Sequence, residues 1–219
     1  MPLLVKMGKT LTYYHATGRK DISGDDWGDI FADAIGGIHF SSPVGIVDVA
    51  HVKMAWSTKT VKDTSPHTSS SARIISGRNS PDYSFGITDP REDIQKTGEA
   101  VLKIWNARVD IAKEEYYPLR EAVLLRNPER RLFTYFETEV GQYAVSEFYW
   151  RENRRGNLEG VRKVDDKHCF TWQPHGSQFT IIHQVPPSAI KFKLRQIPII
   201  DVDSTLVSIG FKEDWITFS

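Results

Sequence analysis

The segment GIVDVAHVKMAWSTKTVK, residues 45–62, carries the pattern from which we predict both the fold and the site of this chain. Two runs rich in β-branched residues flank a short turn around Lys53, which is typical of a β-hairpin. Residues two apart on a strand point to the same face of a sheet, so Ser57 and Lys59 should share a face. Asp48, on the first strand, can point the same way. The sequence therefore predicts a carboxylate and an ammonium group side by side on one hairpin.

Helices are predicted on both sides of this hairpin. The segment SGDDWGDIFADAIGG (23–37) has Ser23 as a candidate N-cap, one apolar face and a Gly-Gly stop. The segment 89–117 has Asp89 as its predicted N-cap and Pro90 at the first helical position. The second half of the chain consists mostly of strand-like runs. This order of elements indicates an α/β fold around one mixed sheet.

The bulk composition limits the classes of protein that the chain can be. With 219 residues and 40% hydrophobic content, it can bury a substantial core. Lys and Arg residues (28) balance Asp and Glu residues (28), which argues against a protein that coats nucleic acid with its whole surface but allows a local basic patch. The single Cys169 excludes a disulfide framework and a cysteine-rich zinc site. Without a signal-peptide pattern or a membrane-length apolar run, we expect a cytoplasmic protein with no membrane partner.

The hairpin residues suit the hydrolysis of a phosphodiester bond. The preceding helix can bring a second carboxylate, Asp29 or Asp33, to the same end of the sheet as Asp48. Two carboxylates with room for water are ligands that Mg²⁺ prefers. A metal held there can polarise a phosphate oxygen and lower the pKa of an attacking water. Lys59 can orient that water and offset negative charge in the transition state.

An acidic helix, an Asp on one strand of a hairpin and a two-residue step to Lys on the next strand resemble the PD-(D/E)XK nuclease superfamily, and within it the type II restriction endonucleases. Asp48 matches the family's aspartate, and STK at 57–59 matches its (D/E)XK step. Asp29 matches the acidic residue that members carry on an early helix. The match covers roughly residues 23–86.

The chain departs from the family pattern at two positions. Pro43 stands five positions before Asp48 instead of next to it. Ser57 occupies the place of the second acidic ligand. Some members of the family compensate for such a change with a carboxylate from a helix, so a helix carboxylate becomes a required part of the predicted site.

The resemblance implies a role for each residue of the site. Asp48 and Asp29 would bind Mg²⁺, with Asp33 as the alternative to Asp29. Lys59 would position the attacking water, and Ser57 would support the metal-bound water. No organic cofactor is implied.

The resemblance also implies a restriction-endonuclease-like fold, an α/β single domain in which helices flank a central mixed β-sheet. The domain would span residues 1–219, with a catalytic core at about 23–115 and a strand-rich DNA-recognition portion at about 119–200. The implied activity is Mg²⁺-dependent hydrolysis of both strands of double-stranded DNA at a short palindromic sequence, in the cytoplasm of a prokaryote. Because one such active site cuts one strand, a twofold homodimer is the simplest assembly.

Three polar segments are candidates for contact with DNA. Arginine suits phosphates or a guanine edge, asparagine suits adenine, and short polar side chains suit base edges generally. Each segment also has an ordinary structural explanation, as a capped turn, a solvated hairpin tip or a kinked strand. The DNA-binding candidates are Arg73, Arg78 and Asn79 in ARIISGRNS, Arg154 and Arg155 at a predicted hairpin tip, and Gln173, His175 and Gln178 around a Pro-His-Gly break.

Three other functions fit the same residues. A repair or structure-specific nuclease would use the same chemistry without a fixed sequence. A DNA-binding module with a decayed nuclease site would explain why serine stands at position 57. In an unrelated α/β protein, Asp48 would bond to backbone groups at a strand end and Lys59 would be a solvated surface residue.

Overall fold

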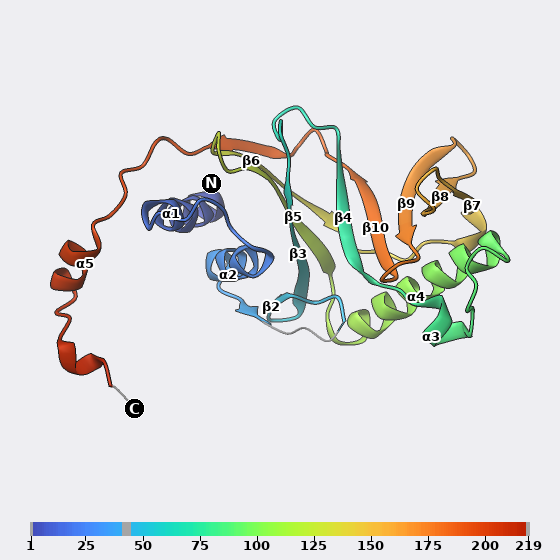
Figure 1. Ribbon diagram of the computed structural model, residues 1–219, viewed down its shortest axis with the longest axis horizontal. Coiled ribbons are helices and arrows are strands. Elements are labelled where there is room, and N and C mark those ends of the chain that lie inside the picture. Colours follow the sequence, from blue (N-terminus) through green and yellow to red (C-terminus); the bar gives the residue numbers. More distant parts are fainter. Residues whose placement is uncertain (1, 41–44, 218–219) are drawn as a thin grey trace.

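The computed structural model describes residues 2–40 and 45–217 and contains two β-sheets with helices packed against them (Figure 1). In the first sheet β3 and β5 are parallel and the other neighbouring strands are antiparallel, so the predicted mixed sheet is confirmed. Its strands are, in spatial order, β1 (Ile38–His39), β2 (Val49–His51), β3 (Met54–Lys62), β5 (Leu119–Asn127), β6 (Leu132–Glu139) and β11 (Ile190–Lys193).

A second, antiparallel sheet was not predicted from the sequence. Strand β4 leaves the hairpin region and pairs with β10, about a hundred residues later in the chain, instead of joining the first sheet. Local alternation of side chains shows that a segment is a strand but does not show which strand it pairs with. The strands of this sheet are, in spatial order, β4 (Ser71–Arg78), β10 (Gln178–Gln184), β9 (Lys167–Gln173), β8 (Leu158–Arg162) and β7 (Phe148–Glu152).

The helices flank the sheets as predicted, although one begins later than expected. The prediction that Ser23 caps α2 is confirmed, because Ser23 Oγ accepts from the amide of Asp26. Asp26 Oδ2 also accepts from the amide of Ser23, which completes a capping box. Helix α4 begins at Ile94 with Asp93 as its N-cap, so the predicted start at Asp89 and Pro90 is wrong; Asp93 Oδ1 accepts from the amide of Lys96. The helices are α1 (Pro2–Ala16), α2 (Gly24–Ile35), α3 (Pro81–Phe85), α4 (Ile94–Glu115) and α5 (Val202–Ser208), with 3₁₀ turns η1 (Val145–Glu147) and η2 (Glu213–Trp215).

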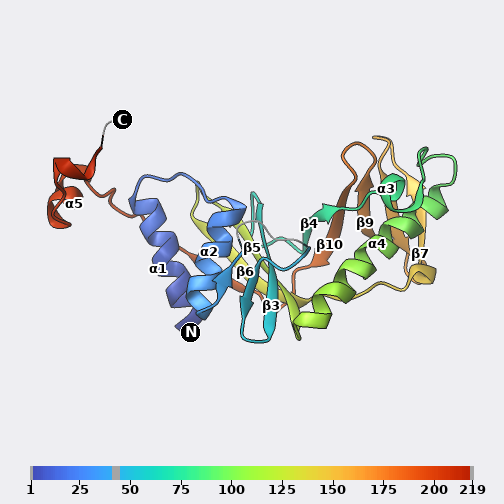
Figure 2. The ribbon, with the colours of Figure 1, turned by 90° about the horizontal axis from the view of Figure 1, so that it is seen from below.

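The first sheet is covered on both faces. Helices α1 and α2 lie on one side, and α4 with the second sheet lies on the other (Figure 2). On the α2 side, Trp27 and Phe31 pack against Trp56 of β3. On the opposite side, Ile74 of β4 packs against Val123 of β5, so the two sheets share a buried core. This second face is the one that carries Ser57 and Lys59, because they alternate with Trp56 along β3.

The last residues of the chain stand apart from the rest (Figures 1 and 2). After β11 the chain passes the end of α1, where the amide of Ile200 donates to the carbonyl of Ala16 at 2.9 Å, and then continues through α5 and η2. This C-terminal segment, residues 199–217, exposes large apolar side chains. They include Ile199, Val202, Val207, Ile209, Trp215 and Ile216. None of the helices described here has the length and apolar character needed to cross a membrane.

Candidate active site

The hairpin brings Asp48, Ser57 and Lys59 together, as the period of the strands predicts. Lys59 Nζ lies 3.0 Å from Asp48 Oδ2, and Ser57 Oγ donates to the same oxygen at 3.1 Å. The amide of Thr58 donates to it as well, at 2.8 Å. Asp48 Oδ2 therefore receives three donors, which fixes the orientation of the carboxylate. The Asp48 and Lys59 side chains are only 17% and 24% exposed, so solvent screens their attraction less than it would on an open surface.

A cavity of about 280 Å³ opens beside this pair. On β3, strand β2 pairs only with Met54–Trp56, so among the described residues the outer edge of β3 beyond Trp56 has no strand partner and faces the cavity. The N-terminus of α2 closes the opposite side. The cavity is lined by Gly24, Asp25, His39, Phe40, Asp48, Thr58, Lys59 and Thr60. Pro43, a position at which the chain departs from the family pattern, lies outside the described residues.

The helix carboxylates are placed differently from the prediction. Asp29 Oδ1 lies 2.8 Å from His39 Nδ1, and of these two residues only His39 lines the cavity. Asp25, one turn earlier on α2, does line it. Asp33 lies one turn beyond Asp29 and is exposed. The carboxylate of α2 that lines the cavity is therefore that of Asp25. Asp29 contacts His39, and His39 lines the cavity.

Gly28 explains how His39 comes so close to α2. A Cβ atom at position 28 would lie 2.3 Å from His39 Nε2, a distance that no real contact shows. A glycine in the middle of an otherwise good helix costs about 1 kcal/mol relative to alanine, so it signals a close approach. This signal, which did not enter the prediction from the sequence, indicates a group packed on the helix but cannot identify His39.

Arg108, which sequence reasoning missed, ties the hairpin to the end of β4. Its Nη2 donates to the carbonyl of Gly45 at 3.0 Å, and its Nη1 donates to Asn79 Oδ1 at 3.1 Å and to the carbonyl of Ser76 at 3.3 Å. Burial lowers the pKa of Arg108, and the nearby Asp48 charge opposes this shift only in part. Gly77, with φ of +126°, leaves room for the guanidinium, because a Cβ there would lie 2.4 Å from Nη1.

Asn79 is a structural residue, and the prediction that it contacts DNA is wrong for this structure. Its side chain is fully buried. Its Nδ2 donates to the carbonyl of Val101 at 2.9 Å, while its Oδ1 accepts from Arg108. An amide whose donor and acceptor are both engaged inside the protein cannot pair with an adenine edge. Instead, Asn79 fixes α4 against the end of β4.

The remaining DNA-binding candidates gather at one end of the second sheet, with one exception. Arg78, Gln178 and Gln173 are consecutive register partners on β4, β10 and β9. Leu158 pairs with Trp172, which puts the β7–β8 turn at the same end as the β9–β10 turn. We call this the loop end of the second sheet; it comprises Arg78, Arg154, Arg155, Gln173, His175 and Gln178. The exception is Arg73, in the middle of β4, whose Nη2 donates to Thr171 Oγ1 at 2.7 Å.

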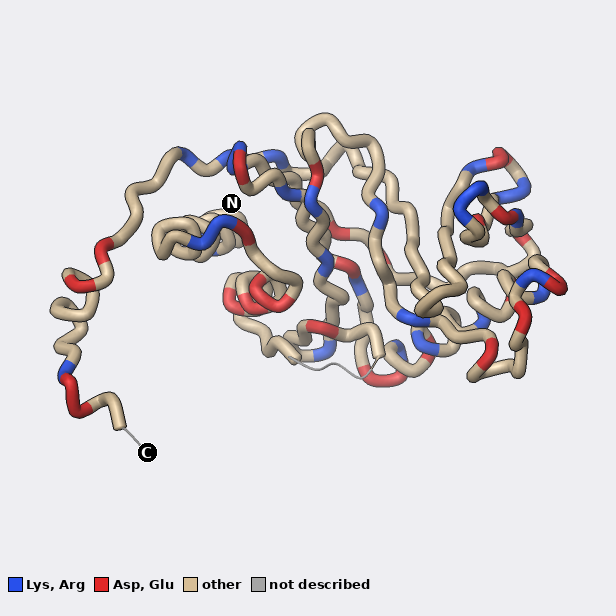
Figure 3. Tube along the Cα trace, in the orientation of Figure 1, with Lys and Arg blue, Asp and Glu red and all other residues tan. Residues whose placement is uncertain are grey.

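Two carboxylates, those of Asp25 and Asp48, line the cavity together with the ammonium group of Lys59. Figure 3 shows acidic segments gathered on α2, the helix whose Asp25 lines the cavity. They belong to Asp25, Asp26, Asp29 and Asp33. Within residues 2–40 and 45–217, however, no group of three or more His, Cys, Asp or Glu side chains converges as a metal site. Asp48 fits one ligand of a hydrated Mg²⁺, which needs only one or two protein carboxylates.

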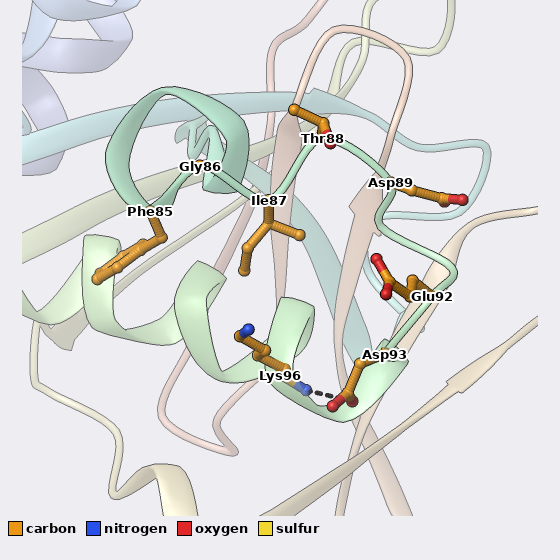
Figure 4. Close-up of a pocket in the computed structure, with 8 residues that line it drawn as sticks. All are labelled: Phe85, Gly86, Ile87, Thr88, Asp89, Glu92, Asp93 and Lys96. Atoms are coloured by element: carbon orange, nitrogen blue, oxygen red, sulfur yellow. Dashed lines mark hydrogen bonds between the residues drawn. The ribbon is translucent and has the colours of Figure 1, made fainter.

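A larger cavity of about 370 Å³ lies between α3 and the start of α4. Figure 4 shows three carboxylates along its rim, those of Asp89, Glu92 and Asp93, pointing in different directions. Asp93 is engaged as the N-cap of α4. Carboxylates that diverge cannot share one cation, so this cavity is a weaker candidate than the one beside Asp48.

The chain was also compared with known proteins. No protein-family model matches it, and neither a curated protein nor a solved structure is significantly similar to it.

Proposed function

We propose that this chain is a Mg²⁺-dependent nuclease that hydrolyses double-stranded DNA at a short specific sequence, a type II restriction endonuclease with a restriction-endonuclease-like fold. The observation that carries the proposal is the contact between Lys59 and Asp48, beside Ser57, on one face of a hairpin next to a cavity. An ammonium group that contacts a carboxylate at the wall of an accessible cavity has both parts needed to hold a cation and a water next to a phosphate.

Each residue of the hairpin has a role in this proposal. Asp48 holds the cation, and Ser57 and the Thr58 amide keep its carboxylate turned toward the cavity. Lys59 holds the attacking water and offsets charge on the phosphate as it is attacked. A bound Mg²⁺ would polarise the phosphate and lower the pKa of the water. Asp29 would have to leave His39 to act as a ligand, whereas Asp25 already lines the cavity.

We propose that the loop end of the second sheet binds DNA. Arg78, Arg154 and Arg155 are exposed there, and Gln173 and Gln178 lie on neighbouring strands between them. Arg108 and Asn79 connect this end to the hairpin, because Arg108 bonds to both the Gly45 carbonyl and Asn79. A duplex that contacts the loop end is thereby held at a set position relative to Asp48.

A second candidate function is a DNA-binding module with a decayed nuclease site. It is favoured by Ser57 in place of an acidic ligand and by the lack of a three-ligand metal cluster in the described part of the chain. The two candidates differ in one result, since both bind DNA but only the first cuts it.

We also propose that the working form is a homodimer, because a palindromic site requires two active sites. The C-terminal segment, residues 199–217, is the surface that a second copy would cover, since its large apolar side chains are exposed on a single chain.

The proposal is tested by digesting unmethylated phage DNA with purified protein in Mg²⁺ and in EDTA, and by sequencing the product ends. Discrete Mg²⁺-dependent fragments that share one terminal sequence would support the restriction endonuclease, and a smear would indicate a repair nuclease. Intact DNA that still shifts on a gel would favour the binding module. The Asp48→Asn variant, which keeps the shape of the side chain, should bind without cutting and excludes a contaminating nuclease.

A further inference from the structure

A second carboxylate lies on the same face as Asp48 and Ser57, one strand further into the sheet. Glu121 of β5 is the register partner of Ser57 in the parallel β3–β5 pair. Paired residues on neighbouring strands point to the same face of a sheet. Asp48 contacts Ser57 from the other side, through the hydrogen bond to its Oδ2. Asp48, just before β2, Ser57 of β3 and Glu121 of β5 thus form a row across the sheet, with the small serine in the middle.

Glu121 is buried with a histidine as its charged partner. The residue is only 2% exposed. His183 Nε2 of β10 lies 2.7 Å from Glu121 Oε2, within the distance of an ion pair, although neither atom has a hydrogen bond of good geometry. A buried carboxylate held by one histidine is costly to desolvate, so the pair calls for an explanation, either structural or functional.

We propose that Glu121 is the second carboxylate of the divalent-cation site, acting with Asp48 across Ser57. This inference rests on the proposed function and supplies the ligand that the hairpin itself lacks at position 57. Two strand spacings of about 4.8 Å separate the backbones of Asp48 and Glu121, which leaves room for two carboxylates to share one ion at about 2.1 Å from each.

His183 is the alternative partner of Glu121. In this structure the carboxylate faces His183, so coordination requires the Glu121 side chain to rotate toward Ser57. Their ion pair also joins β5 of the first sheet to β10 of the second. A purely structural role for the pair is therefore the competing explanation, and the test must separate the two.

The test is the affinity for Mn²⁺, measured by the electron paramagnetic resonance signal of the free ion. Glu121→Gln should weaken Mn²⁺ binding at least tenfold, as Asp48→Asn should, while Glu139→Gln, at an exposed position of β6, should leave it unchanged. His183→Gln breaks the same buried pair but keeps the carboxylate, so it should retain Mn²⁺ affinity. Equal Mn²⁺ affinity of the wild type and Glu121→Gln would overturn the inference, and so would equal losses in Glu121→Gln and His183→Gln.

Two further results must be distinguished: misfolding of the Glu121→Gln variant, and failure of the proposed function rather than of the cation site. If Glu121→Gln fails to fold, the double variant Glu121→Leu with His183→Leu replaces the pair by apolar groups, a change that buried ion pairs often tolerate; it should fold and bind no Mn²⁺ at the site. If the wild type cuts DNA and Glu121→Gln cuts equally fast, the inference fails and the proposed function stands. If the wild type binds Mn²⁺ through Glu121 but never cuts DNA, the proposed function fails and the cation site stands.

Discussion

Lys59 Nζ lies 3.0 Å from Asp48 Oδ2. This contact joins the two arms of the hairpin, which are adjacent because the chain folds back on itself. The same oxygen accepts from Ser57 and from the Thr58 amide, so one carboxylate oxygen is held by three groups of β3. Both side chains are partly buried, and both line the cavity. The pair therefore differs from the exposed ion pairs of a protein surface, which contribute about 0–1 kcal/mol to stability.

Replacing Lys59 by methionine should abolish cutting and preserve binding. Loss of a group that positions and activates water costs about 10²–10⁴-fold in rate. Cleavage rate and gel-shift affinity are measured on the same DNA. Lys62→Met is the matched control, because Lys62 lies on the same strand but pairs with Asp21 at 2.9 Å. Wild-type cutting by Lys59→Met would contradict the assignment.

Neutralising an arginine at the loop end should lower the salt dependence of DNA binding. Each phosphate contact that is lost reduces the slope of log K against log salt by about 1. Arg78→Ala and Arg154→Ala are therefore expected to show shallower slopes than the wild type in a titration of binding against NaCl. Arg130→Ala serves as the control, since Arg130 is exposed in the β5–β6 turn of the other sheet. Unchanged slopes in both variants would mean that DNA lies elsewhere.

Removing the guanidinium of Arg108 should destabilise the protein strongly. Its loss leaves Asn79 Oδ1 and the Ser76 carbonyl, both at buried residues, without this donor, and each unsatisfied buried group costs about 1–3 kcal/mol. Arg108→Met should lower the free energy of unfolding by about 2–4 kcal/mol in a urea titration. The exposed Arg154→Ala should change it by less than about 0.5 kcal/mol. Equal stability of the two variants would show that Arg108 does not hold the hairpin to α4.

Glu137 should make the protein sensitive to acid. Burial by itself would raise the pKa of this carboxyl, but hydrogen bonds from Tyr135, Trp56 and Arg120 outweigh burial and lower its pKa below the ordinary 4.5. A lowered pKa in the folded state stabilises the protein above the unfolded value, and this contribution is lost as the pH falls below 4.5.

The melting temperature of the wild type should therefore fall more steeply below pH 4.5 than that of Glu137→Gln, which cannot titrate at this position. Glu139→Gln, a change at an exposed position of the same strand, should behave like the wild type. Parallel melting curves for the wild type and Glu137→Gln would contradict the role assigned to these hydrogen bonds.

Deleting residues 201–219 should convert a dimer into a monomer. The deletion removes apolar side chains that a single chain leaves in water, so the rest of the fold should be unaffected. Light scattering after size-exclusion chromatography measures the mass of both forms. A substitution of Trp215 by serine should weaken the dimer without removing backbone. If the full-length chain and the deletion variant have the same oligomeric state, this segment is not the interface.

The sequence predicted the elements near the hairpin well and their long-range pairing poorly. The start of α2 is correct because its signals are local, with Ser23 and Asp26 three residues apart. The start of α4 was misplaced because Asp89 and Asp93 are both suitable N-caps, and only the bond from the Lys96 amide decides between them. In the same way, the sequence could not decide which helix carboxylate lines the cavity, since Asp25, Asp29 and Asp33 all lie on the polar side of one helix.

By itself, the sequence determined that Asp48, Ser57 and Lys59 meet. A hairpin with a two-residue side-chain period fixes that geometry within a dozen residues. Only the tertiary structure decided that Glu121 stands beside Ser57, that Asn79 is buried and that the candidate DNA contacts share one sheet end. The physical reason is that pairing between distant strands depends on which apolar faces can be buried together, and several pairings satisfy the same local alternation.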